Sequence, residues 1–135
     1  MYLLDTDTVI YSLKGHPDVV RNLAFHANDP LSVSAITLME LYYGAFKSRQ
    51  VVGNLAKVRA IESAVRVWDV QSDSAEVFGA LKAQLENDGN RLDDFDLAIA
   101  ACALVHKITL VTNNTVHFAR IPGLRLDNWT LPLTG

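Results

Sequence analysis

Short apolar runs alternate along this chain with segments of helical periodicity, and this alternation limits the possible folds more than any other feature. The runs read as continuously apolar, which is typical of strands that are covered on both faces. They predict an α/β fold with a mostly parallel central sheet, helices on both faces and right-handed crossovers. We expect strands at residues 2–4, 31–35, 65–70, 108–112 and 124–129.

The segments between these runs predict helices. The first helix covers residues 8–14, with Gly15 and Pro17 after it, and a Thr-x-x-Glu capping box from Thr37 to Glu40 opens the third. Residues 97–105 are apolar on all sides, so this helix is predicted to be buried. The expected inward-facing residues of the other helices are Val20, Leu23, Ala24 and Ala27, then Val51, Leu55, Val58 and Val65, and, in a helix over 73–87, Ala75, Phe78, Leu81 and Leu85.

Length and composition limit the class of protein. A chain of 135 residues is long enough for one domain with a hydrophobic core, so we expect a single domain over residues 1–135. The net charge of −3 does not favour a non-specific nucleic-acid binder, although an acidic site that holds a metal can still bind phosphate. Cys102 is the only cysteine, which fits a reducing cytoplasm, and no apolar run approaches a membrane span.

The acids at the predicted helix starts each have an ordinary structural explanation. Asp7 suits the N-cap of the first helix, and Glu40 completes the capping box. Asp93 or Asp94 can cap the buried helix, where a further acid in the first turn suits the helix dipole. Taken singly, none of these acids requires a catalytic role.

Taken together, three acids indicate a functional site: Asp5, Glu40 and Asp96. The carboxyl ends of parallel strands and the N-termini of the helices that follow them lie at one edge of a sheet, where such folds place their sites. Partly buried carboxylates at that edge repel one another, and a divalent cation relieves this repulsion. Ligands that are all oxygen, without a Cys/His set, favour Mg²⁺ or Mn²⁺ over zinc and suit phosphate chemistry.

Four motifs, in order, resemble the PIN-domain ribonucleases, above all the VapC-type toxins of type II toxin–antitoxin pairs. They are "LLDTDTVIY", "SAITLMELYYGA", "DDFDLAIAACAL" and "LVTNNTVHFARIPGLRLDNW", and together they span almost the whole chain. The resemblance implies a three-layer α/β/α sandwich and an endoribonuclease that depends on Mg²⁺ or Mn²⁺. It also implies a small VapB-like antitoxin as partner, and a homodimer.

The resemblance also assigns the acids. Asp5 corresponds to the first metal ligand of the family and Asp96 to the aspartate of its "DxxIAA" motif. Glu40 corresponds to the second acid, which holds the metal through a bound water, and Asp94 stands where many members have a further catalytic acid. In the implied mechanism, the ion activates a water that attacks an RNA phosphodiester and leaves a 3′-hydroxyl and a 5′-phosphate.

Four further residues are predicted to line the site. Thr112 and Asn114 correspond to the polar strand end of the family. His117 departs from the family pattern, because many members have an acid there, and it is either a surface histidine or a substitute ligand or phosphate contact. Asp7 stands where asparagine is common, and it either adds ligand charge or caps the helix.

The remaining expectations concern RNA and partners. The resemblance favours tRNA as substrate, with the initiator tRNA as a first guess. Apolar residues near the second acid either pack an antitoxin helix or a second copy of the chain, or belong to the core. The candidate phosphate contacts are Lys14, Lys47, Arg49 and Arg91, and the candidate apolar contacts are Tyr42, Tyr43 and Phe46.

Two other functions compete with this interpretation. "LLDTDTV" also resembles the DxD motif of haloacid-dehalogenase-type phosphohydrolases, in which Asp5 is the nucleophile, Asp7 the general acid and Ser34 a phosphate-binding hydroxyl. The chain is short for that fold, and the motif leaves Glu40 without a role. The second alternative is a PIN fold kept only for binding, against which the retained acids argue.

Overall fold

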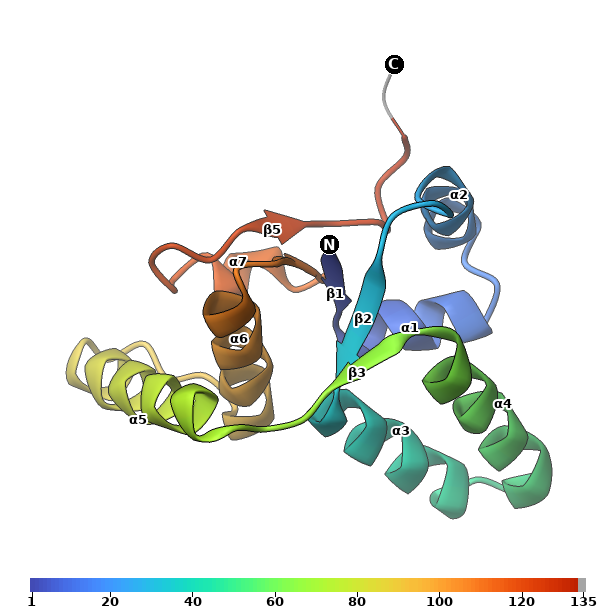
Figure 1. The fold of residues 1–135 in the computed structure, drawn as a ribbon, viewed down its shortest axis with the longest axis horizontal. Helices are drawn as coiled ribbons and strands as arrows, with labels where there is room; N and C mark the ends of the chain where they lie inside the picture. Colours follow the sequence, from blue (N-terminus) through green and yellow to red (C-terminus); the bar gives the residue numbers. More distant parts are fainter. Residues whose placement is uncertain (134–135) are drawn as a thin grey trace.

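The computed structural model describes residues 1–133, so the last two residues of the expected domain lie outside the described part of the chain. Its sheet has five parallel strands in the order β3-β2-β1-β4-β5, with helices on both faces (Figure 1). This confirms the predicted α/β/α architecture. The elements are β1 (Tyr2–Leu4), α1 (Thr6–Leu13), α2 (Pro17–Phe25), β2 (Leu31–Ser34), α3 (Ala35–Lys47), α4 (Val51–Ala64), β3 (Arg66–Trp68), α5 (Ser72–Asn87), α6 (Asp94–His106), β4 (Thr109–Val111), α7 (Thr115–Phe118) and β5 (Leu126–Asp127).

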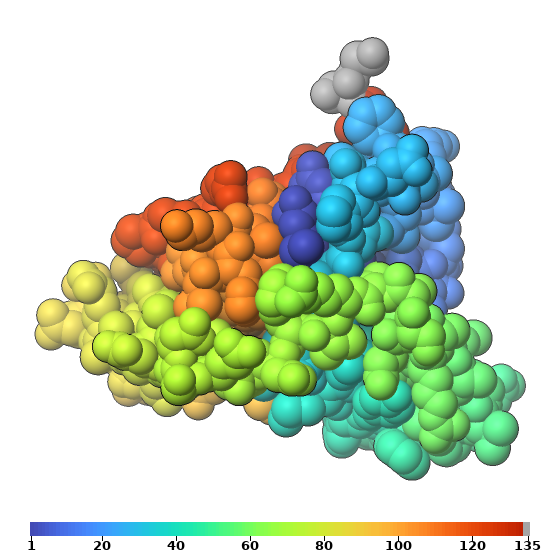
Figure 2. All heavy atoms as spheres, in the orientation of Figure 1, coloured from blue at the N-terminus to red at the C-terminus, as the bar shows by residue number. Residues whose placement is uncertain are grey.

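Successive residues of the central strands enter two different hydrophobic cores, because side chains alternate between the faces of a sheet. Leu3 and Leu110 pack in the core that contains residues of α5, α6 and α7. Leu4 and Val111 pack in the core that contains residues of α1, α3 and α4. In the space-filling view, α5 and the α3–α4 pair form opposite corners of the molecule (Figure 2). The continuously apolar strands thus reflect two covered faces, as the sequence predicts.

Helix α6 is the buried helix that the apolar segment predicts. It begins at Asp94 and has Asp93 as its N-cap, whose Oδ2 accepts a hydrogen bond from the backbone N–H of Phe95 at 3.1 Å. Its buried residues are Leu97, Ile99, Ala100, Ala101, Cys102 and Ala103. None of the helices between residues 1 and 133 combines the length and the apolar character that a membrane span needs.

Two predicted helix starts are wrong. Helix α1 begins at Thr6 with Asp5 as its N-cap, so Asp7 lies in the first turn and is not the cap. Helix α3 begins at Ala35, because the hydroxyl of Ser34 accepts a hydrogen bond from the backbone N–H of Ile36. The predicted capping box from Thr37 is therefore absent. In both cases the helix starts directly from the strand, earlier than the apolar pattern indicates.

The predicted inward faces of two helices also need correction. In α2, Val19 and Asn22 are buried, whereas Val20 is 46% exposed and Ala24 is also exposed, so the inward face differs from the predicted one. In α5, Ser74 is buried and Ala75 is exposed. Strands β3 and β5 are shorter than predicted, and α7 was not predicted.

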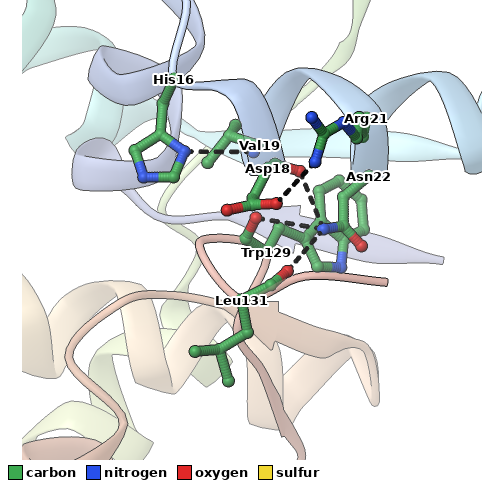
Figure 3. A network of polar contacts seen from close by, with 7 residues as sticks. All are labelled: His16, Asp18, Val19, Arg21, Asn22, Trp129 and Leu131. Carbon is green, nitrogen blue, oxygen red and sulfur yellow. Dashed lines mark hydrogen bonds and ion pairs between the residues drawn. The ribbon is translucent and has the colours of Figure 1, made fainter. Parts of the chain in front are cut away.

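Asn22 fastens the C-terminal segment to α2 (Figure 3). Its side-chain amide donates to the backbone carbonyls of Trp129 and Leu131, each at 3.1 Å, and to the carbonyl of Asp18 at 2.9 Å. Trp129, only 1% exposed, packs against the rings of Tyr2 and His26 within the core that contains residues of α1, α3 and α4. A polar residue on the buried face of α2 is thus explained by the carbonyls that it satisfies.

We expect Asn22→Ala to lower the free energy of unfolding by about 2 kcal/mol, because buried carbonyls lose their donor. Denaturant unfolding measures this loss. The control is Arg21→Ala, which removes only the exposed ion pair between Arg21 and Asp18 and is expected to cost less than about 0.5 kcal/mol. Equal effects of the two variants would contradict the role given to Asn22.

Candidate active site

The predicted acids come from elements that meet at the carboxyl edge of the sheet. Asp5 directly follows β1, and Thr112 directly follows β4, the strand paired with β1. Glu40 lies on α3, which begins where β2 ends. Asp96 lies in the first turn of α6, whose other end leads into β4. The parallel topology therefore brings residues from four distant segments to one edge.

Asp5 is the most buried acid of this group, with 5% of its surface exposed. Its Oδ1 accepts from the backbone N–H of Thr6 at 2.9 Å, and its Oδ2 accepts from the hydroxyl of Thr112 at 2.8 Å. Burial, the charge of Asp7 and, more weakly, the charge of Asp96 raise the pKa of Asp5 to about 7 despite these bonds. The carboxylate is thus held in one orientation, in surroundings that disfavour its negative charge.

Asp96 is half-buried and lies in the same field of negative charge. Burial raises its pKa to about 6, and the charges of Asp93, Glu40 and Asp7 contribute. His117 on α7 acts in the opposite direction and lowers the pKa of Asp96. The acids predicted to act together therefore influence one another in the folded chain.

The loop after β4 is tied to α1 by Asp7. The Oδ2 of Asp7 accepts from the backbone N–H of Asn113 at 3.1 Å. The backbone N–H of Asn114 in turn donates to the Thr112 hydroxyl at 3.0 Å. Burial raises the pKa of Asp7 as well. Asp7 thus braces the loop that carries Thr112, the residue that orients Asp5.

The chain matches the PIN domain family model over residues 2–124. It belongs to the PIN-domain family. Ribonuclease VapC2 of Rickettsia felis is 37% identical to this chain, over 96% of this chain and 98% of the relative. The tRNA(fMet)-specific endonuclease VapC of Salmonella typhimurium is also 37% identical, over 95% of this chain and 97% of the relative. The solved structure of VapBC2 from Rickettsia felis, bound to a DNA fragment from its promoter, is also similar. It has a TM-score of 0.88, with 36% identity over 95% of this chain and 98% of that one.

These findings confirm the family that the sequence motifs indicate. In this PIN domain, Asp5, Glu40, Asp96 and Thr112 hold the positions at the sheet edge described above. The rival haloacid-dehalogenase resemblance finds no comparable support. The hydroxyl of Ser34, its proposed phosphate contact, caps α3, and Asp7 sits inside α1.

Asp94 is not brought into the same group of contacts. Its Oδ1 pairs with Nζ of Lys82 on α5 at 2.9 Å, and its side chain is 59% exposed. This pairing raises the pKa of Lys82. Asp93, which the sequence predicts only as a possible cap, is one of the acids whose charge raises the pKa of Asp96.

Thr6 is the second residue of the site that the sequence reasoning missed. Its hydroxyl donates to Glu40 Oε1 at 2.7 Å, and it lies directly between two acids, Asp5 and Asp7. The signal in the sequence is the position of a hydroxyl residue between two acids at a strand end. Such a hydroxyl can donate to a third carboxylate nearby.

The donor set fits a divalent cation of the Mg²⁺ type. Within residues 1–133, no three His, Cys, Asp or Glu side chains form a ready-made metal cage. Mg²⁺ does not require one, because it commonly takes one or two carboxylates and keeps several waters. Burial raises the pKa values of Asp5, Asp7 and Asp96, and a bound cation offsets that penalty.

Proposed function

We propose that this PIN domain is an endoribonuclease that depends on Mg²⁺ or Mn²⁺ and acts as the toxin of a type II toxin–antitoxin pair. One observation carries the proposal: at the carboxyl edge of the sheet the charge of Asp96 acts on Asp5 and the charge of Glu40 acts on Asp96, in a family whose relatives are named ribonucleases. The structural relatives described as VapBC complexes support the toxin role.

In this proposal, Asp5 and Asp96 hold the cation, and Glu40 orients the attacking water. A divalent ion bound there supplies Lewis acidity toward water and toward the phosphodiester. Thr112 and the Thr6 backbone hold both oxygens of Asp5, so the carboxylate is oriented before a ligand binds. No side-chain nucleophile is needed, because water itself attacks the phosphorus.

We infer that tRNA is the substrate, because curated relatives in Salmonella typhimurium and Shigella flexneri, each 37% identical, are named tRNA(fMet)-specific endonucleases. Lys14 and Lys57 line the same cavity as Glu40, so they are suitable contacts for RNA phosphates beside the acids. Arg91 instead lines a second cavity with Lys82 and Asp94.

We also propose that a VapB-like antitoxin lies along the α1–α3 surface. Two cavities on this surface share Ile10 and Glu40. The larger of the two has a volume of about 550 Å³ and is also lined by Met39, Tyr43 and Phe95. An apolar antitoxin segment suits this surface, and an antitoxin arginine suits the acids next to it. Of the predicted contacts, Tyr43 and Phe46 are exposed, and Tyr42 is half-buried. The homodimer stays a prediction.

The substrate class is tested with the purified chain, freed of any partner, in Mg²⁺ buffer. It is incubated in parallel with initiator tRNA, with an elongator tRNA and with p-nitrophenyl phosphate. We expect discrete fragments of the initiator tRNA and no phosphatase turnover, with Asp7→Asn keeping at least about a tenth of the cleavage rate. Phosphatase turnover that Asp7→Asn abolishes would overturn the proposal in favour of the phosphohydrolase.

A further inference from the structure

Thr6 and Thr37 form a short chain of hydroxyl groups that ends on Glu40. The hydroxyl of Thr6 lies 2.7 Å from Glu40 Oε1 and 3.2 Å from the hydroxyl of Thr37. Thr37 has no exposed surface, and Thr6 is 9% exposed. These hydroxyl groups join the first turn of α1 to the first turn of α3, the helix that carries Glu40.

The number of protons on the two hydroxyl groups sets the direction of hydrogen-bond donation between them. A hydroxyl has one proton to donate, and an ionised carboxylate accepts only. The short contact therefore assigns the Thr6 proton to Glu40. Within residues 1–133, the hydroxyl of Thr37 has Thr6 as its only hydrogen-bond partner, so Thr37 donates to the oxygen of Thr6. The resulting order is Thr37 to Thr6 to Glu40.

The chain of hydroxyls acts on a side chain that needs restraint. Glu40 is half-buried and lies one turn beyond Thr37 on α3. Fixing a free glutamate side chain costs conformational entropy. The hydrogen bond from the Thr6 hydroxyl to Glu40 Oε1 offsets that cost. Donation from Thr37 also polarises the Thr6 hydroxyl and strengthens the bond to Glu40.

We propose that Thr6, supported by Thr37, is a positioning residue that holds Glu40 in its working orientation. This inference rests on the proposed ribonuclease function, and it adds a role that neither the family match nor the names of the relatives assign. Thr6 thus serves the site twice, because its backbone N–H holds Asp5 and its hydroxyl holds Glu40.

The test uses Thr6→Val, which keeps the shape and removes the hydroxyl, and Thr6→Ser, which restores the hydroxyl. We expect Thr6→Val to lower kcat about 30-fold with KM changed less than about 3-fold, and Thr6→Ser to stay within about 3-fold of wild type. Thr37→Val, which removes only the second hydroxyl, is expected to lower kcat about 5-fold. Ser12→Ala is the matched control, because within residues 1–133 the hydroxyl of Ser12, also on α1, bonds only to the Val9 carbonyl of its own helix.

A double-mutant cycle with Glu40→Gln shows whether Thr6 acts through Glu40. We expect Thr6→Val to have little further effect in the Glu40→Gln background. A second readout needs no RNA: it is the rise in Tm that Mg²⁺ alone causes. We expect Thr6→Val and Glu40→Gln each to reduce this rise, and the double variant to reduce it no further than Glu40→Gln does. If wild type cleaves tRNA and Thr6→Val does so equally well, or if the two effects add, the inference is wrong. If wild type cleaves no RNA, the proposed function itself fails.

Discussion

Asp5→Asn and Asp96→Asn are each expected to lower the rate of RNA cleavage about 1,000-fold, which corresponds to about 4 kcal/mol of transition-state stabilisation. Each substitution keeps the shape of the side chain and removes the negative charge that a cation needs. The asparagine in Asp5→Asn retains an amide oxygen that can accept from the Thr6 backbone, so the fold should survive. Initial cleavage rates and circular dichroism on the same samples separate lost chemistry from lost structure.

Asp94→Asn is the matched comparison for these variants. Asp94 pairs with Lys82 and is largely exposed, so its replacement is expected to lower the rate less than about 10-fold. An Asp94→Asn variant as inactive as Asp96→Asn would restore the catalytic role that the sequence predicts for Asp94. Full activity of Asp5→Asn or Asp96→Asn would remove that residue from the site.

The second large effect is a pH dependence of the metal-free protein that runs opposite to that of an ordinary carboxylate. Because the folded pKa of Asp5, about 7, lies above its usual value of 3.8, the folded state binds the proton more tightly. The contribution of Asp5 to the free energy of unfolding is therefore largest below pH 3.8 and is lost as the pH rises toward 7. Between pH 5 and pH 8, the loss amounts to about 3 kcal/mol in the absence of a cation.

Denaturant unfolding in EDTA at pH 5 and pH 8 isolates this contribution when wild type is compared with Asp5→Asn. We expect the free energy of unfolding of Asp5→Asn, relative to that of wild type, to rise by about 3 kcal/mol from pH 5 to pH 8. Asp69→Asn, at an exposed position, is the control and should show no such gain. A difference between wild type and Asp5→Asn that is the same at both pH values would contradict the raised pKa.

The sequence predicts the architecture and the acids for a physical reason. Buried parallel strands must be continuously apolar, and their carboxyl ends must share an edge, so the placement of Asp5, Glu40 and Asp96 follows from the strand–helix alternation. The family resemblance adds Thr112, and its hydrogen bond to Asp5 explains why a hydroxyl stands at that strand end.

The errors arise where a local pattern allows more than one structure. Thr37-x-x-Glu40 fits a capping box, but Ser34 caps α3, and tertiary contact turns the Thr37 hydroxyl to Thr6 instead. Asn22 is not among the predicted inward residues of its helix, and its buried partners are the carbonyls of Trp129 and Leu131, more than 100 positions away. Such long-range partners leave no periodic signal in the chain.

In the proposed function, the acids at the sheet edge hold the divalent ion that RNA cleavage requires. The most direct measurement is calorimetric titration of Mg²⁺ into the metal-free protein at pH 8, with wild type and Asp5→Asn compared at equal concentration. We expect saturable binding to wild type and a loss of at least about 10-fold in affinity in Asp5→Asn. Equal Mg²⁺ affinity of the two proteins would contradict it.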